Sequence, residues 1–142
     1  MSTASTTPAE LFNAANTAKT FAYAPYSNFR VGAALRTTSG RIFTGCNVEN
    51  SSYGLAICAE RTALVKAVSE GFREFTDICV TTDLTDKFCS PCGACRQFIV
   101  EFGLDITVHL CKPDGSSQIT TSGRILPDAF TPADLKLDRV KA

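Results

Sequence analysis

The sequence predicts an α/β fold of three layers (α/β/α), in which a five-stranded mixed sheet lies between helices. Two observations predict this class. The chain shows a strand, helix, strand, helix, strand order, whose right-handed crossovers leave those three strands parallel and cover the sheet with helices. The first of these strands is also joined to an earlier strand by a short turn around Ser39 and Gly40, which requires an antiparallel pair. We therefore expect an antiparallel N-terminal hairpin and parallel central strands.

The length and composition fit a single domain. A domain near 142 residues buries about two-thirds of its unfolded surface. With 44% hydrophobic and 20% charged residues, the chain has material for a core and lacks the polar bias of a disordered protein. We expect one domain over residues 1–142, with its core over about residues 8–132.

The charge pattern narrows the classes of partner. There are 14 basic and 14 acidic residues, the formal net charge is zero, and no run of Lys or Arg is present. Nucleic acids and anionic membranes are bound through such positive charge, so we expect neither as a partner. A small uncharged substrate suits this chain better.

The start of the chain and its cysteines predict a cytoplasmic protein. The first 20 residues hold Glu10, one lysine and no unbroken apolar stretch, unlike a signal peptide or a membrane span. Thiols stay reduced in the cytosol, and an odd count of seven cysteines cannot all pair within one chain. We expect thiols and metal ligands rather than disulfides.

The first element is expected to be a helix from about Pro8 to Tyr23. Thr7 and Glu10 have the spacing of a capping box, with Pro8 at the first helical position, where its missing N–H is no loss. One apolar stripe for packing on a sheet is formed by Leu11, Ala15, Ala18 and Ala22.

The later elements follow from β-branched runs and from glycines that end helices. They are strands over residues 29–37 and 41–50, a helix over 56–69, a strand over 77–82, a helix over 91–102, and strands over 106–111 and 118–121. After Phe130 we expect a short helix or a tail.

Three cysteines and one glutamate form the most informative pattern. Cys58 opens a Cys-Ala-Glu segment, and Cys92 and Cys95 lie three residues apart in Pro-Cys-Gly-Ala-Cys. Three thiolates fill three corners of a tetrahedron around Zn²⁺ and leave the fourth free for water, which is typical of a catalytic zinc site. Glu60 is placed to handle the protons of that water. The set resembles the site of zinc deaminases.

The cysteines are expected at helix starts. Pro91 precedes Cys92 as the first residue of a helix, and Cys58 begins another. The positive ends of both helix dipoles would lower the thiol pKa and favour metal binding. Zinc with three thiolates carries a net negative charge, so we predict that Arg61 hydrogen-bonds one or more of the thiolates and draws charge from them.

Other interpretations of these residues stay open. Cys89 could complete a closed, structural four-cysteine zinc site, with Glu60 on the surface. The remaining cysteines, Cys46, Cys79 and Cys111, are expected in the core. The single histidine, His109, lies mid-strand, which disfavours a ligand or base role and a Cys-His hydrolase.

Four segments resemble the motifs of the small homotetrameric cytidine deaminases, the three-cysteine type of the cytidine and deoxycytidylate deaminase family. They are residues 26–33 (YSNFRVGA), 45–50 (GCNVEN), 58–63 (CAERTA) and 90–97 (SPCGACRQ). The likeness covers about residues 8–132. It implies the cytidine deaminase fold, one Zn²⁺ per subunit, and hydrolysis of cytidine and 2′-deoxycytidine to uridine and 2′-deoxyuridine with release of ammonia, in pyrimidine salvage.

The resemblance also implies roles for substrate-binding residues. Asn47 and Glu49 would bind the ribose 3′-hydroxyl, Phe29 would pack on the nucleoside, and the Ala59 backbone would hold the pyrimidine. Asn47 and Glu49 alternate along a strand end and so face one side. Glu49 as a solvated charge and Phe29 as a core residue remain alternatives.

By the same resemblance, each active site is shared between subunits of a homotetramer. Tyr53 and Phe130 match positions that a neighbouring subunit contributes. A small domain closes an open nucleoside pocket with a partner's surface.

The implied mechanism uses water activated by zinc, which attacks C4 of cytosine while Glu60 moves the protons. A deaminase of a modified aminonucleoside would share the zinc residues. A polynucleotide-editing deaminase would need positive charge, and a zinc-stabilised interaction module would need four protein ligands. The motifs leave the preference between cytidine and deoxycytidine open.

Overall fold

Five strands form one mixed sheet in the computed structural model, which describes residues 7–141. The strands are β1 (Val31–Thr37), β2 (Ile42–Cys46), β3 (Phe75–Thr82), β4 (Thr107–Cys111) and β5 (Ser117–Thr121). Their order across the sheet is β2-β1-β3-β4-β5, and every neighbouring pair is antiparallel except β3 and β4. The predicted fold class is confirmed.

The three strands expected to be parallel do run in the same direction, but they are not all neighbours in the sheet. β2 and β3 both run antiparallel to β1, and β4 runs parallel to β3, so β2, β3 and β4 share one direction. Strand β1 nevertheless lies between β2 and β3. Among the five strands only β3 and β4 form a parallel pair, and the hairpin supplies an inner strand, β1, as well as the edge strand β2.

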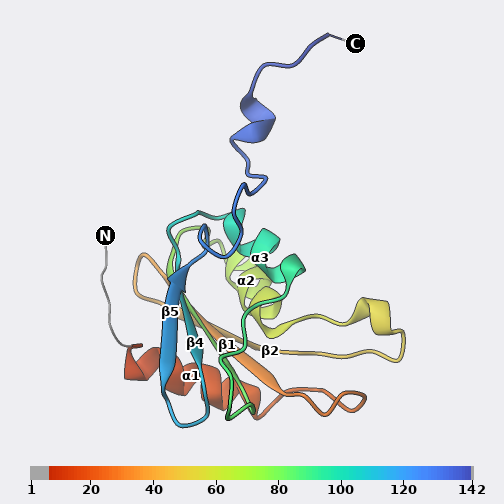
Figure 1. Cartoon of the computed structure of the whole chain (residues 1–142), viewed down its shortest axis with the longest axis vertical. Helices are drawn as coiled ribbons and strands as arrows, with labels where there is room; N and C mark the ends of the chain where they lie inside the picture. Colours follow the sequence, from red (N-terminus) through yellow and green to blue (C-terminus); the bar gives the residue numbers. More distant parts are fainter. Residues whose placement is uncertain (1–6, 142) are drawn as a thin grey trace.

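Helices cover both faces of the sheet (Figure 1). Helix α1 (Ala9–Lys19) lies on one face, and α2 (Ala59–Ser69) and α3 (Gly93–Val100) lie on the other. The alternation of side chains in β1 follows these layers, because Ala34 packs with the α1 side while Ala33 and Leu35 pack with α2.

Two glycines let the helices lie directly on the strands. A Cβ at Gly32 of β1 would stand 2.1 Å from the carbonyl oxygen of Ala15 in α1. A Cβ at Gly45 of β2 would stand 2.6 Å from the carbonyl oxygen of Ala59 in α2. Any side chain at Gly45 would therefore push away the start of α2, where the cysteine and glutamate of the Cys-Ala-Glu segment lie.

Helix α1 begins at Ala9 and ends at Lys19, whereas the expected helix runs from about Pro8 to Tyr23. Pro8 is the N-cap residue and no side chain caps the helix, so the capping box of Thr7 and Glu10 is wrong. The Thr7 hydroxyl instead lies 3.0 Å from Nδ1 of His109, whose Nε2 lies 2.7 Å from an Asp77 carboxylate oxygen. A fully buried imidazole must have both nitrogens paired, and this requirement outweighs the cap.

The C-terminal part beyond the sheet is mostly exposed. A 3-10 turn, η2 (Asp134–Lys136), is the short helix expected after Phe130, and the chain after it extends away from the sheet (Figure 1). Among residues 7–141, none of the helices has the length and apolar character that crossing a membrane requires.

Candidate metal centre and active site

Two helix starts on the same face of the sheet bring three cysteines together. Cys58 is the N-cap residue of α2, Cys92 is the N-cap residue of α3, and Cys95 lies in the first turn of α3. Pro91 therefore precedes the N-cap instead of taking the first helical position. The three sulfur atoms all lie within 4.8 Å of one another.

The sulfur geometry fits a zinc ion. Zn–S bonds of about 2.3 Å at tetrahedral angles hold two sulfurs about 3.8 Å apart. The Sγ atoms of Cys58 and Cys92 are 3.8 Å apart. Within the described chain, the cluster of potential metal ligands contains Cys58, Cys92 and Cys95 but not Cys89. Three protein ligands leave a tetrahedral zinc one open position, as a catalytic site requires.

The surroundings of Cys58 favour its thiolate. Its pKa is lowered to about 5, first by a hydrogen bond from Cys95 and then by Arg61 and Cys92. A sulfur that loses its proton this readily is prepared to bind a metal, because the thiolate is the ligand form of cysteine.

Arg61 makes the predicted contact with the metal ligands. Its Nη2 donates a hydrogen bond to Cys58 Sγ at 3.4 Å. Its Nε is buried and has no hydrogen-bond partner among residues 7–141. The hydrogen bond with Cys58 holds the pKa of Arg61 above its ordinary value, so the guanidinium stays charged beside the sulfurs.

We expect Arg61→Gln to weaken zinc binding and turnover together. Groups that hydrogen-bond metal ligands typically change metal affinity or activity by about 10–100-fold when they are removed. Zinc affinity measured by competition with a chromogenic chelator, together with kcat, checks this. Arg41→Gln is the matched control, since Arg41 pairs with Glu70 at an exposed position and does not line the site. Unchanged zinc affinity and kcat in Arg61→Gln would rule out the role.

Glu60 lies in the first turn of α2 and is only 4% exposed. Burial, and to a smaller extent the charge on Cys58, raise the pKa of its carboxyl to about 7. A carboxyl with a pKa near neutrality can both accept and release a proton, which is the property of a general acid-base group. The interpretation of Glu60 as a surface residue is wrong.

A cavity of about 430 Å³ joins the metal cluster to the predicted substrate residues. We call it the site cavity. The predicted residues that line it are Phe29, Asn47, Glu49, Cys58, Glu60 and Cys92. Its volume is within the range of small-molecule pockets. Sequence reasoning missed Val31 and Thr82 in its wall, although the alternation of strand residues could have indicated Val31 from Phe29.

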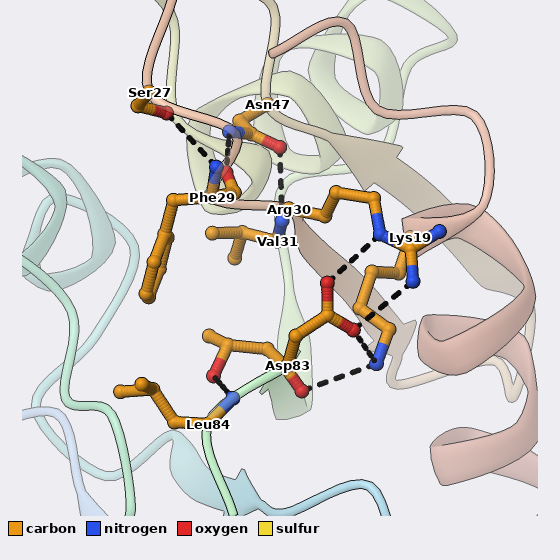
Figure 2. Close-up of polar contacts among 9 residues, drawn as sticks. Lys19, Ser27, Phe29, Arg30, Val31, Asn47, Asp83 and Leu84 are labelled. Atoms are coloured by element: carbon orange, nitrogen blue, oxygen red, sulfur yellow. Dashed lines mark hydrogen bonds and ion pairs between the residues drawn. The ribbon is translucent and has the colours of Figure 1, made fainter.

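Asn47 and Glu49 are held in place by the segment that precedes β1. Asn47 Nδ2 donates to the carbonyl of Phe29 at 2.7 Å, and Asn47 Oδ1 accepts from the Val31 N–H at 2.9 Å (Figure 2). The Glu49 carboxylate accepts from the Ser27 hydroxyl and from the backbone N–H groups of Tyr26 and Ser27. The Ser27 hydrogen bond lowers the pKa of Glu49, so Glu49 is an anchored carboxylate instead of a free surface charge.

The other three predicted substrate residues lie outside the wall of the site cavity. Ala59 is fully buried in the core beside Cys58. Tyr53 is 75% exposed and lines an adjoining hollow with Tyr26 and Glu49. Phe130 is 57% exposed, and its carbonyl accepts a hydrogen bond from Gln97 of α3.

Residues 5–111 match the family described as the cytidine and deoxycytidylate deaminase zinc-binding region. The chain belongs to this deaminase family. A Dictyostelium discoideum protein named "Probable cytidine deaminase" is 57% identical over 123 residues, which cover 87% of this chain and 83% of that protein. The cytidine deaminase of Sporosarcina psychrophila is 50% identical over 115 residues, which cover 80% of this chain and 84% of the relative.

Solved structures agree with this membership of the cytidine and deoxycytidylate deaminase family. The crystal structure of cytidine deaminase from Burkholderia pseudomallei superposes with a TM-score of 0.84 at 51% identity, covering 87% of this chain and 99% of that one. The family and the cluster of Cys58, Cys92 and Cys95 together make this protein a zinc-dependent deaminase.

Proposed function

We propose that this enzyme hydrolyses cytidine and 2′-deoxycytidine to uridine and 2′-deoxyuridine, with release of ammonia. The observation that carries the proposal is that one cavity is lined by Cys58 and Cys92 of the metal cluster, by buried Glu60, and by Asn47 and Glu49. The relatives described above, which are named cytidine deaminase or probable cytidine deaminase, support it. In this proposal the reaction belongs to pyrimidine salvage in the cytoplasm.

Glu60 moves the protons of the proposed reaction. Zinc held by the three cysteines supplies a Lewis acid that makes water acidic enough to lose a proton near neutral pH. Glu60 accepts that proton as the water oxygen bonds to C4 of the cytosine ring, and it then protonates N3. The remaining proton of the water passes through Glu60 to the amino group, the C4–N4 bond breaks, and the products are the uracil nucleoside and ammonia. The pKa of Glu60 near 7 suits both transfers.

Asn47 and Glu49 bind the sugar in this proposal. A neutral amide has two N–H donors and two acceptor lone pairs, and the contacts with Phe29 and Val31 use one of each. Asn47 keeps one donor and one lone pair for a ligand. The ribose 3′-hydroxyl can accept from Asn47 and donate to Glu49. Phe29 packs on the nucleoside, and the Ala59 backbone holds the pyrimidine.

We expect Glu49→Gln to raise the KM for cytidine by about 10-fold or more, because a hydrogen bond to a charged group contributes about 1.5–3 kcal/mol. Zinc content should stay unchanged. Steady-state kinetics with cytidine, and with free cytosine as a substrate that lacks the sugar, checks this. The variant should treat cytosine as the wild type does, and the exposed Glu74→Gln is the matched control. An equal rise in the KM for cytosine would contradict the role of Glu49 in sugar binding.

We also propose a homotetramer whose subunits complete one another's sites with Tyr53 and Phe130. The exposure of both side chains supports it. Further large apolar side chains are exposed in the two segments that join α1 to β1 and β2 to α2, namely Phe21, Tyr23, Tyr26, Val48, Leu55 and Ile57. Buried against other copies, they would close a cavity that is open in a single chain. Neither nucleic acid nor a membrane is a partner in this proposal.

The deciding experiment follows ultraviolet absorbance after zinc-loaded protein is mixed with cytidine, deoxycytidine or a short cytosine-containing oligonucleotide. Conversion of the nucleosides alone supports the proposed function, and light scattering of the same sample measures the oligomer. Conversion of the oligonucleotide would contradict the proposed function and indicate a polynucleotide deaminase. No conversion with zinc bound would point to a modified aminonucleoside substrate or to an interaction module.

A further inference from the structure

Three charged side chains form a bridge on the sheet face opposite the zinc site. Lys19 Nζ at the end of α1 lies 3.0 Å from an oxygen of Asp83, which follows β3. Arg30, which precedes β1, donates to the same carboxylate from Nε at 2.8 Å and from Nη2 at 3.1 Å. Figure 2 shows the side chains of Lys19 and Arg30 converging on Asp83. We call this group the Asp83 bridge.

Each end of the Asp83 bridge is next to a residue that lines the site cavity. Arg30 stands between Phe29 and Val31, and Asp83 follows Thr82, and these three neighbours all line the cavity. Val31 and Thr82 are also register partners between β1 and β3. Successive residues of a strand point to opposite faces of the sheet. At the start of β1 and the end of β3, one face therefore carries the Asp83 bridge and the other face carries the cavity wall.

The Asp83 bridge also closes the sheet where backbone pairing stops. Val31 and Thr82 form the last partnered pair of β1 and β3, so Arg30 and Asp83 lie one residue beyond it. Before Arg30, Asn28 has a left-handed backbone with φ of 57°, which marks a sharp turn in the chain. A two-point contact between a guanidinium and a carboxylate fixes orientation as well as distance.

Lys19 links the same place to α1. Its side chain is only 6% exposed, and Nζ donates to the Thr82 carbonyl at 3.1 Å as well as to Asp83. A buried ammonium needs a charged partner, so the Asp83 carboxylate holds Lys19 in position under Thr82. The backbone of a cavity residue is thereby tied to a helix that does not touch the cavity.

We propose that Asp83 is a positioning residue for nucleoside binding, which acts by joining Lys19 and Arg30 and so setting the separation of Phe29 and Thr82 across the cavity wall. This inference rests on the proposed nucleoside deamination. Asp83 does not line the site cavity, and its ion pairs are with Lys19 and Arg30. The reacting centre lies on α2 and α3, so losing the bridge changes how the nucleoside fits and leaves the proton transfers intact.

The expected result is a change in KM at nearly constant kcat. Arg30→Gln and Asp83→Asn should each raise the KM for cytidine by about 2- to 30-fold, the size typical of coupling through a packed network. Their kcat and zinc content should match those of the wild type, as expected when only binding is lost. Arg30 is 47% exposed, so its replacement leaves the fold intact even if Asp83→Asn destabilises the protein.

Glu70→Gln is the matched control. It breaks an ion pair with Arg41 at 2.9 Å, whose exposures of 54% and 44% resemble the 47% and 44% of Arg30 and Asp83. Glu70 follows the last residue of α2, at the opposite end from Cys58. A merely structural role would lower the melting temperature or the active fraction in the bridge variants without moving KM.

The double variant Lys19→Met with Asp83→Asn separates positioning from an unpaired buried charge. It should recover melting temperature lost in Asp83→Asn while its KM stays raised. A wild-type KM in the double variant, an unchanged KM in both single variants, or an equal rise in Glu70→Gln would each overturn the inference. If the wild type itself does not convert cytidine, the proposed function fails first and this inference fails with it.

Discussion

Glu60→Gln is expected to lower kcat for cytidine by at least about 10²–10⁴-fold, the usual contribution of general acid-base catalysis. Glutamine keeps the shape of the side chain and removes its ability to accept and release a proton. Since Glu60 is buried in the site cavity and its pKa is raised to about 7, the lost proton transfers account for the expected effect.

Zinc analysis by mass spectrometry and steady-state kinetics on the same samples check this prediction. The variant should keep its zinc, because Glu60 is not one of the three clustered cysteines. Glu101→Gln, an exposed glutamate just after α3, is the control and should have wild-type kcat. A near-normal rate in Glu60→Gln would remove Glu60 from the mechanism.

Cys92→Ser is expected to lose nearly all zinc and turnover, whereas Cys89→Ser should keep both. Removing a group that only supports a metal ligand already costs about 10–100-fold, so losing a ligand itself should cost more than about 100-fold. Cys92 belongs to the sulfur cluster, and Cys89 lines the site cavity without joining that cluster.

Zinc stoichiometry and kcat of the two variants check this pair of predictions. A chelator should inactivate the wild type, and added zinc should restore it, because thiolate ligands can bind the metal again. Equal loss of zinc in Cys89→Ser and Cys92→Ser would indicate a closed four-cysteine site, in which zinc supports the fold and does not take part in catalysis.

Each half of the zinc cluster could be predicted from the sequence because it depends on residue types at short spacings, whereas the meeting of Cys58 with Cys92, 34 residues apart, was expected from the resemblance to zinc deaminases. Cys92 and Cys95 are three residues apart, so a helix turn places both on one side. Arg61 follows Cys58 by three residues in the same turn, and its predicted contact with that sulfur is present. The order and kind of the strands and the three main helices were likewise predictable, since local apolar periodicity encodes them.

Patterns with more than one possible partner were not predictable from the sequence. Thr7 and Glu10 have the spacing of a cap, but the Thr7 hydroxyl pairs with buried His109, which lies 102 residues away in the chain. The buried ring has no water to replace that hydroxyl, whereas the N-terminal N–H groups of a helix have more alternatives. The spacing of Thr7 and Glu10 indicates only the possible helix cap. It holds no information on the competing hydrogen bond to His109.

By itself the sequence determined which cysteines are the candidate zinc ligands, which carboxyl is expected beside them, and which segments become helices and strands. Only the tertiary structure decided that β1 lies between β2 and β3, that burial raises the pKa of Glu60, and that Lys19 and Arg30 meet at Asp83. The physical reason is range. Residues within one turn or strand fix each other's direction through the backbone, whereas contacts between distant segments depend on how the whole chain packs.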